Sequence, residues 1–336
     1  MSITVAEADS AANGSPSATR ADRAATMQLV VSAIDTSVTG IRSITLADPD
    51  GRALPGFVPG SHLVVHAGEC TNAYSLTGDG RHPTHYSISV LKVDDGNGGS
   101  RWLHEQLAVG DLLTVGLPRN AFAPVARARK HLLVAGGIGI TPMVSHLRAA
   151  VRWRRDTQLL YVFREDAAAH LADVTALGRG RAELFTDRVS FTARLFETLR
   201  AQPIGTHLYV CGPSAMIDAV VDAAVAAGWP DSRIHFERFG IDALDAGDPF
   251  RVDLTESGRS IDVPPGTSML EALEEAGVEV PNLCRQGVCG ECRIPLATGS
   301  PIHRDLYLSA EEKDAGDAVM PCVSRAAEGC ILEVPL

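Results

Sequence analysis

Four cysteines near the C-terminus constrain the fold of this chain more than any other feature. Cys284, Cys289 and Cys292 share one short segment, and Cys322 follows after a long gap. The spacing C-x4-C-x2-C with a distant fourth cysteine is the ligand pattern of a plant-type [2Fe–2S] cluster. A short loop can supply three thiolates to so small a cage, and the fourth comes from another part of the chain. We therefore predict that these four cysteines bind a [2Fe–2S] cluster.

Two glycines, Gly287 and Gly290, stand between these cysteines. A loop wrapped around a cluster needs backbone that takes positive φ angles and approaches the bound group closely, which glycine allows. The alternative is a four-cysteine zinc site. Zinc sites usually bring their ligands as two short C-x2-C pairs, whereas this chain has a triplet and a single cysteine. The spacing therefore favours the iron–sulfur cluster.

Length and charge bound the class of protein. The 336 residues are enough for two or three domains, and the hydrophobic content of 45% is that of ordinary globular domains. The formal net charge of −11 argues against non-specific nucleic-acid binding. The sequence contains no run of about 18 apolar residues, so no membrane span is predicted. We expect a monomer that binds neither nucleic acid nor a membrane.

The cysteine count bears on the compartment. Seven cysteines, an odd number, fit a thiolate cluster in a reducing cytoplasm better than a disulfide framework. We interpret Cys70 and Cys330 as structural.

Residues 1–26 are rich in Ala, Ser, Thr and Asp and lack the basic start and apolar core of a signal peptide. We predict that they form a disordered tail.

Residues 27–127 have the pattern of an antiparallel β domain. Short alternating apolar stretches recur between Gly and Pro turn signals, which predicts a small β-barrel. Within it, residues 72–76 (NAYSL) can offer a planar ligand an aromatic face from Tyr74 and a hydroxyl from Ser75.

A glycine run follows in the same domain. It leads through Gly98 and Gly99 into a short amphipathic helix with Ser100 as its expected N-cap. Free N–H groups at such a helix start can hold a phosphate. The alternative is an ordinary flexible loop, and the run by itself does not decide between them.

Residues 128–243 alternate buried strands with helices, which predicts a parallel sheet covered by helices on both faces. A fully apolar strand leads into the run GGIGITPM from Gly136, and a later strand ends at Cys211-Gly212-Pro213. Ligands of such sheets bind at the carboxyl ends of the strands, where glycines let phosphates approach. The run differs from the G-x-G-x-x-G fingerprint, so alone it does not establish a dinucleotide site.

Residues 244–250 contain Asp, Gly and Pro and are predicted to form a linker. Residues 251–336 predict a compact α+β domain with a hairpin around Ser257-Gly258 and a helix opened by a capping box of Ser268 and Glu271. Seven basic and fifteen acidic residues make it the acidic part of the chain. That charge can serve solubility, or it can form an acidic docking surface.

These motifs, in this order, resemble those of the phthalate dioxygenase reductase family, which includes vanillate demethylase and carnitine monooxygenase reductases. The cysteine pattern is highly specific, and residues 136–142 and 211–213 match motifs of the wider ferredoxin reductase superfamily. The resemblance covers residues 27–336. It implies an FMN-binding antiparallel β-barrel (27–127), an NAD-binding α/β parallel-sheet domain (128–243) and an α+β, β-grasp [2Fe–2S] ferredoxin domain (251–336).

The resemblance also implies roles for individual residues. It places Ser75 near the redox-active N5 of FMN, Asp187 on the ribose hydroxyls of NADH, and the Phe239 ring over the flavin until nicotinamide displaces it. The implied catalytic residues are Ser75, Cys211, Glu237 and Phe239. The implied cofactor-binding residues are Asn72, Tyr74, Ser75, Leu76, Gly98, Gly99, Ser100, Gly136, Gly137, Gly139, Thr141, Pro142, Asp187, Cys211, Gly212, Pro213 and Phe239. The implied iron ligands are Cys284, Cys289, Cys292 and Cys322.

One position departs from the family pattern. An arginine often stands two residues before the tyrosine and contacts the flavin phosphate, whereas this chain has Asn72, a variant that occurs among the carnitine-type members. The charge partner of the phosphate is therefore open among Arg81, Arg101 and Arg119.

Electron counting supports the implied cofactor order. Nicotinamide gives two electrons as a hydride, a cluster takes one at a time, and a flavin between them accepts two and releases them singly. We predict an NADH-dependent oxidoreductase that passes electrons through FMN and [2Fe–2S] to a terminal oxygenase or demethylase, expected to be a Rieske non-haem iron enzyme. The alternatives are a reductase for a cytochrome P450 or another acceptor and, from a different class, a zinc-stabilised binding module. We find no 2-His-1-carboxylate pattern for oxygen activation in the sequence.

Overall fold

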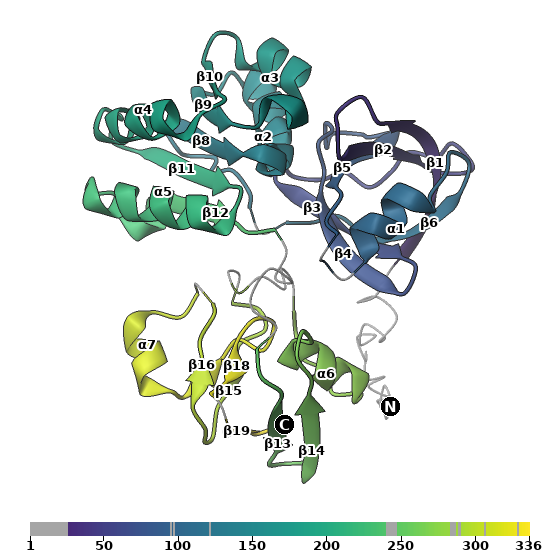
Figure 1. Cartoon of the computed structure of the whole chain (residues 1–336), viewed down its shortest axis with the longest axis vertical. Coiled ribbons are helices and arrows are strands. Elements are labelled where there is room, and N and C mark those ends of the chain that lie inside the picture. The colour runs from purple at the N-terminus through teal and green to yellow at the C-terminus, as the bar shows by residue number, and fades with distance from the viewer. Residues whose placement is uncertain are drawn as a thin grey trace, which may run out of the picture.

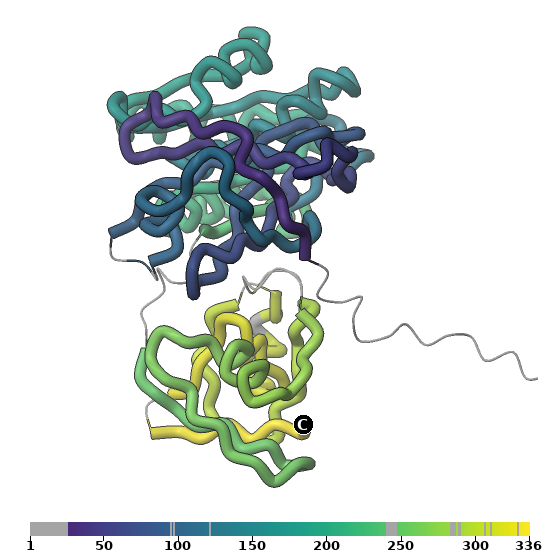
Figure 2. Tube along the Cα trace, turned by 90° about the vertical axis from the view of Figure 1, so that its right-hand side faces the viewer, coloured from purple at the N-terminus to yellow at the C-terminus, as the bar shows by residue number. Residues whose placement is uncertain are grey.

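The computed structural model describes residues 26–94, 96, 98–120, 122–239, 247–282, 287, 290–305, 307–327 and 329–336. Figure 1 shows three bodies in chain order: a barrel, a layered α/β body beside it, and a smaller body that holds the C-terminus. The view turned by 90° in Figure 2 shows the C-terminal body set apart from the other two. The predicted tail lies outside the described residues, apart from Thr26. Within the described ranges no helix has the length and apolar character needed to cross a membrane.

The first body is a barrel of antiparallel strands in the order β4-β3-β6-β1-β2-β5, with β7 paired to β3. A bridge between Leu76 and Ile88 and a hydrogen bond of 2.9 Å from the Thr77 N–H to the Ser87 carbonyl join the two ends of this path. The predicted β-barrel is therefore confirmed. Its elements are β1 (Thr26–Asp35), β2 (Ile41–Ala47), β3 (Ser61–Ala67), β4 (Cys70–Ser75), β5 (His85–Leu91), α1 (Gly99–Glu105), β6 (Leu112–Gly116) and β7 (Arg119–Asn120).

The second body is a parallel sheet in the order β10-β9-β8-β11-β12. Leu133 and Ala135 of β8 pack in one core cluster with side chains of α2 and α3. The alternate residues Leu132 and Val134 pack in another with side chains of α4 and α5, so helices cover both faces as predicted. The elements are β8 (Lys130–Gly136), α2 (Ile140–Trp153), β9 (Thr157–Val162), α3 (Leu171–Gly178), β10 (Ala182–Phe185), α4 (Arg188–Arg200), β11 (Thr206–Cys211), α5 (Ser214–Ala226) and β12 (Ile234–Glu237).

The strand order of this sheet fixes where a ligand can bind. The chain builds outward from β8 to β9 and β10, then returns to the other side of β8 with β11 and β12. The direction of winding therefore reverses between β8 and β11. A crevice opens outside the carboxyl ends of two such strands because their connections run to opposite faces.

The third body contains a mixed sheet in the order β14-β13-β19, with β14 antiparallel and β19 parallel to β13. The predicted hairpin forms, and both hydrogen bonds of the predicted Ser268–Glu271 capping box are present at α6. Its buried core cluster contains only residues from Phe250 onward. The elements are β13 (Phe250–Leu254), β14 (Arg259–Val263), α6 (Met269–Glu275), β15 (Ile294–Pro295), β16 (Pro301–Ile302), α7 (Ala310–Ala315), β17 (Ala318–Val319), β18 (Arg325–Ala326) and β19 (Ile331–Val334).

Histidine rings surround Tyr209 inside the second body. His131, His146 and His235 lie with their ring centroids 5.4, 5.1 and 4.6 Å from the Tyr209 ring, and His207 stacks on His235. Burial lowers the pKa of His146 to about 3 and that of His235 to about 4. These side chains are therefore neutral in the folded protein near neutral pH.

We expect the free energy of unfolding to fall as the pH drops from about 6.5 towards 4. Below pH 6.5 the histidines of the unfolded chain bind protons, whereas the buried rings of His146 and His235 stay neutral in the folded chain. Acid therefore favours the unfolded state, and the stability present above pH 6.5 is lost as the pH falls towards 4. His146→Gln should flatten this fall in denaturant titrations run across the pH range. Substitution of the exposed His85 is the matched control, and equal slopes for wild type and His146→Gln would contradict the prediction.

Candidate functional site

Two loops meet at the point where the winding reverses, and glycines allow them to do so. A Cβ on Gly139 would lie 2.3 Å from the Cys211 carbonyl oxygen. A Cβ on Gly136 would lie 2.6 Å from the sulfur of Met216, and one on Gly212 would lie 3.0 Å from the Gly136 nitrogen. The structure thus brings the predicted GGIG run and the Cys-Gly-Pro segment together, packed too tightly for side chains at these three positions.

Helix α2 begins directly after the glycine run. Gly137, with φ +52°, opens a short 3-10 turn, and Thr141 and Pro142 fall in the first turn of α2. The Thr141 hydroxyl donates to the Ile138 carbonyl at 3.0 Å. Among the described residues no side chain caps the start of α2. The Ile140 N–H already donates to the Gly137 and Ile138 carbonyls. Pro142 has no N–H, so the Thr141 N–H is the one in this turn that can meet a phosphate. The predicted dinucleotide residues thus lie together on one edge of the sheet.

A carboxyl and a thiol lie side by side at the same edge. Cys211 and Glu237 are register partners at the last positions of β11 and β12, and both are buried. Burial raises the pKa of Glu237 to about 8, and burial together with Glu237 raises the pKa of the Cys211 thiol well above its usual value. Glu237 Oε2 has no hydrogen-bond partner in the part of the chain that the structure describes. A neutral carboxyl so placed can donate a hydrogen bond to a bound group.

Ser75 and His62 form a second polar pair, on the barrel. They are register partners on β4 and β3, whereas their neighbours Tyr74 and Leu63 pack in the barrel core. Ser75 and His62 therefore face the opposite side of the sheet, yet only 4% and 3% of their surfaces are exposed. Neither Ser75 Oγ nor His62 Nδ1 has a partner among the described residues. Buried unsatisfied polar atoms of this kind fit a site shaped for a polar, planar ligand.

His62 was missed by reasoning from the sequence. Burial, and secondarily the charge of Arg119, lowers its pKa to about 4, so the imidazole is neutral. The signal that could have found it is its strand register with Ser75, which depends on a pairing set by the tertiary fold. By contrast, the predicted contact residue Leu76 has its side chain fully buried in the barrel core.

The structure corrects the predicted cap of α1. The N-cap is Gly98, with φ 95°, and the helix begins at Gly99, so Ser100 lies in its first turn. The Ser100 hydroxyl instead accepts a hydrogen bond from the Val93 N–H at 3.1 Å and closes the loop. The left-handed φ at the cap position explains the shift, because it favours glycine over serine.

The glycine loop lies against Asn72. A Cβ on Gly99 would be 2.5 Å from Asn72 Oδ1, so these predicted phosphate-site residues are adjacent. Of the three candidate arginines, Arg101 lies on α1, the helix that this loop leads into, and donates to the Asp94 carbonyl at 2.6 Å. Arg119 lies instead opposite His62, and Arg81 lies in an exposed turn. Position therefore favours Arg101 as the cation beside the loop.

Two predicted residues lie at the rim of the α/β site. Asp187 is exposed two residues after the end of β10 and caps α4 by accepting the Ser190 N–H at 2.8 Å, which lowers the pKa of its carboxyl. Phe239 is half-buried and packs against the core cluster that contains Cys211. Their roles at the ribose and over the flavin stay predictions.

Two of the four predicted iron ligands meet in the third body. The sulfur atoms of Cys292 and Cys322 are 3.2 Å apart, longer than the roughly 2.05 Å of a disulfide bond. Both side chains are buried in its core. Cys284 and Cys289 lie outside the described residues. Two thiols brought together from distant segments fit the predicted cluster.

The glycines of the cysteine loop behave as the sequence predicts. Gly287 and Gly290 have φ angles of +70° and +78°. A Cβ on Gly287 would lie 2.6 Å from a Val323 methyl, and one on Gly290 would lie 2.2 Å from the Tyr307 ring. Both positions therefore require glycine for conformation and for space.

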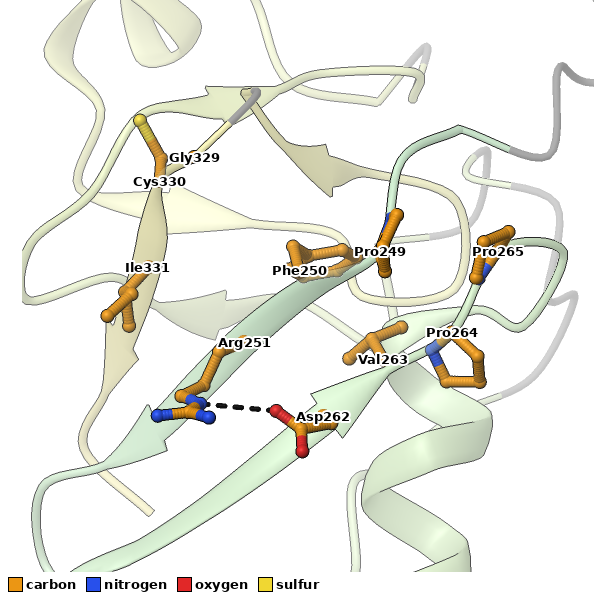
Figure 3. A pocket seen from close by; sticks show the side chains of 10 residues that line it. All are labelled: Pro249, Phe250, Arg251, Asp262, Val263, Pro264, Pro265, Gly329, Cys330 and Ile331. Atoms are coloured by element: carbon orange, nitrogen blue, oxygen red, sulfur yellow. Dashed lines mark hydrogen bonds and ion pairs between the residues drawn. The ribbon is translucent and has the colours of Figure 1, made fainter.

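Cys330 lines a different surface of this body. It borders an open groove of about 600 Å³ over β13, β14 and the start of β19, together with Phe250, Val263 and Ile331 (Figure 3). An ion pair between Arg251 and Asp262, 3.1 Å long, crosses one end of the groove. The structural role of Cys330 stays a prediction.

Known proteins resemble the chain along most of its length. Residues 252–327 match the 2Fe-2S iron-sulfur cluster binding domain, and residues 115–234 match the N-terminal domain of dimethylamine monooxygenase subunit DmmA-like proteins. The chain is 35% identical over 312 residues to phthalate dioxygenase reductase of Burkholderia cepacia, covering 89% of this chain and 94% of that protein. The chain belongs to the phthalate dioxygenase reductase family.

Two further comparisons describe its place within the phthalate dioxygenase reductase family. It is 41% identical over 308 residues to the heme-dependent oxidative N-demethylase beta subunit of Ectopseudomonas mendocina, covering 89% of this chain and 98% of that one. It matches the solved structure of a phthalate dioxygenase reductase, described as modular for electron transfer from pyridine nucleotides to [2Fe–2S]. That match has a TM-score of 0.76 at 34% identity and covers 94% and 99% of the two chains. The predicted family and three-part fold class are thereby confirmed.

Proposed function

We propose that this chain is the reductase component of a multi-component oxygenase. It is an NADH-dependent flavin iron–sulfur oxidoreductase that passes electrons from NADH through FMN and a [2Fe–2S] cluster to a terminal oxygenase. The observation that carries the proposal is a shared architecture with phthalate dioxygenase reductase over 94% of the chain. When bound, the flavin accepts an electron pair from the nicotinamide and releases single electrons to the cluster.

The residues of the chain hold these groups and exclude water from them. Gly136, Gly139 and Gly212 let the two loops pack against each other at the carboxyl edge of the sheet, where the dinucleotide would bind. Ser75 and the neutral Glu237 carboxyl offer buried hydrogen bonds to the flavin and nicotinamide rings. Electrostatic and hydrogen-bonding groups act strongly in so dry a site because little solvent screens them. The four cysteines hold the irons as thiolates.

Anaerobic titration with NADH tests the proposal directly. The purified protein should be yellow-brown and should bleach on NADH addition, and heat should release FMN identifiable by chromatography. An FAD peak would overturn the flavin assignment. A colourless zinc protein would refute the reductase function altogether.

The terminal partner is expected to be a Rieske non-haem iron oxygenase or demethylase. A haem-dependent oxygenase is the second candidate, because the chain is 41% identical to the beta subunit of a heme-dependent N-demethylase. Turnover of the reductase with each type of oxygenase encoded beside it, followed by product identification, distinguishes them. Productive coupling to one type and failure with the other decides the partner.

We expect a preference for NADH over NADPH that depends on Asp187. Its ionised carboxylate can accept bonds from two ribose hydroxyls but repels a 2′-phosphate. Asp187→Ala should reduce the ratio of kcat/KM values for NADH and NADPH by roughly tenfold, because the charge that repels a 2′-phosphate is lost. Asp187→Asn keeps a capping oxygen for the Ser190 N–H and so separates the loss of charge from the loss of the cap. An unchanged ratio in both variants would contradict the assignment.

A further inference from the structure

One helix joins the two bodies that are proposed to hold nicotinamide and flavin. α2 begins at the dinucleotide loop, and three of its side chains reach the barrel. Ser145 Oγ accepts the Gly60 N–H at 2.9 Å, Arg148 Nε donates to the Thr77 carbonyl at 2.9 Å, and Arg152 pairs with Asp79. The three side chains come from one face of the helix, because positions three and seven apart project in similar directions.

The barrel atoms that α2 contacts lie close to the proposed flavin residues. Thr77 follows Ser75 by two positions, and its N–H group closes the barrel against Ser87. Gly60 directly precedes β3, and His62 of β3 is the register partner of Ser75. Any shift of α2 relative to these segments therefore moves the dinucleotide loop relative to Ser75.

The Arg148 guanidinium is held by two hydrogen-bond partners from different segments. Its Nη2 donates to Asp173 Oδ1 at 2.8 Å, so one guanidinium holds a barrel carbonyl and an α3 carboxylate together. The other oxygen of Asp173 lies 3.0 Å from His170 Nδ1, and His170 Nε2 lies 2.8 Å from Ser89 Oγ on the barrel. Hydrogen bonding to His170 and the charge of Arg148 lower the pKa of Asp173. One carboxylate thus supports two separate links to the barrel.

Ser89, His170 and Asp173 are linked in the same order as a catalytic Ser–His–Asp triad, but Ser89 is not placed to act as a nucleophile. Ser89 is 5% exposed, and its hydroxyl oxygen is also 2.7 Å from Ser43 Oγ on the neighbouring strand. A buried hydroxyl with two hydrogen-bond partners is poorly placed to attack a substrate. The hydrogen bonds of His170 to Ser89 and Asp173 instead connect β5 of the barrel to the start of α3. They add to the connection that Arg148 makes from α2.

We propose that Arg148 is a positioning residue for hydride transfer: its guanidinium, anchored by Asp173, sets the separation between the dinucleotide loop and Ser75. The role rests on the proposed function, because it concerns the distance between nicotinamide and flavin. Arg148 exchanges neither protons nor electrons. It acts through α2 and the Thr77 carbonyl, and a displacement of about 1 Å between reacting groups can cost roughly 100-fold in rate.

The test compares Arg148→Ala and Arg148→Lys with wild type by anaerobic rapid mixing with NADH. Arg148→Ala should lower the limiting rate of flavin reduction by about 10-fold to 100-fold and change the apparent NADH dissociation constant by less than about threefold. Arg148→Lys should recover only part of the rate, because one ammonium lacks the fork that holds Thr77 and Asp173 together. Amide hydrogen exchange should quicken at residues 77–80 in Arg148→Ala, measured without NADH.

Arg181→Ala is the matched control. It removes an exposed ion pair with Asp156 that lies wholly within the α/β body, and it should leave both readouts unchanged. A limiting rate within about twofold of wild type in Arg148→Ala, or an equal loss in Arg181→Ala, would overturn the proposal. Should Arg148→Ala not fold, Asp173→Asn weakens the same anchor and must show the same split between rate and affinity. Wild-type flavin that NADH fails to reduce would refute the proposed function instead.

Discussion

Cys292→Ala and Cys322→Ala should each reduce the iron content of the purified protein to near zero. The two sulfurs lie 3.2 Å apart in the core of the third body, so loss of either leaves an iron without a thiolate and open to solvent. The same result is expected for Cys284→Ala and Cys289→Ala. Iron analysis and visible absorbance measure the loss directly.

Cys330→Ala is the matched control. This cysteine belongs to the same body but borders the groove over β13 and β14, so its removal should leave the iron content unchanged. All the variants should keep FMN and reduce ferricyanide with NADH, which shows that the rest of the chain is folded. Equal iron loss in Cys330→Ala would mean that the fourth ligand is wrongly assigned.

A protein that ends at Asp245 should fold, keep FMN and still reduce ferricyanide, but it should give no support to the terminal oxygenase. The barrel and the α/β body share packing, since Ile41 and Phe122 lie in the same core cluster as Leu133 and Tyr209. The removed body has a separate core made only of residues from Phe250 onward. The truncation therefore cuts between cores rather than through one.

The full-length protein is the control for this truncation, assayed for ferricyanide, cytochrome c and oxygenase-coupled turnover. Cytochrome c reduction should fall sharply with the cluster, whereas ferricyanide can draw on the flavin. A truncated protein that still drives its oxygenase would show that the cluster is not the exit point for electrons. If docking uses the acidic residues of the removed body, coupling in the intact protein should weaken with salt as the Debye length falls below roughly 8 Å.

Features that depend on a few neighbouring residues were predicted well. The capping box at Ser268 and Glu271 forms as expected, because its two hydrogen bonds span only three positions. Gly287 and Gly290 take the positive φ angles that the cysteine spacing demands. The predicted N-cap of α1, Ser100, was wrong by two positions, because the N-cap is Gly98. The Ser100 hydroxyl instead accepts the Val93 N–H and closes the preceding loop.

Contacts between distant segments were not predicted. The pairing of His62 with Ser75 needs the register of β3 against β4, and a one-residue slip would turn His62 to the other face of the sheet. The link from Arg148 to Thr77 joins two bodies across 71 positions of sequence. Neither His62 nor Arg148 carries a motif, so nothing local marks them.

The sequence by itself predicted the [2Fe–2S] cluster and the order of the three bodies, because thiolate spacing and strand periodicity are local consequences of residue type. The flavin and the nicotinamide were implied by the family resemblance. Tertiary structure alone decided which polar atoms are buried without a partner among the described residues and how the nucleotide body is connected to the barrel. Burial of Glu237, and with it a pKa of about 8, arises only when β12 pairs with β11 and the sheet is covered. Desolvation and cross-domain hydrogen bonds depend on what surrounds a residue in space, and that neighbourhood exists only in the folded chain.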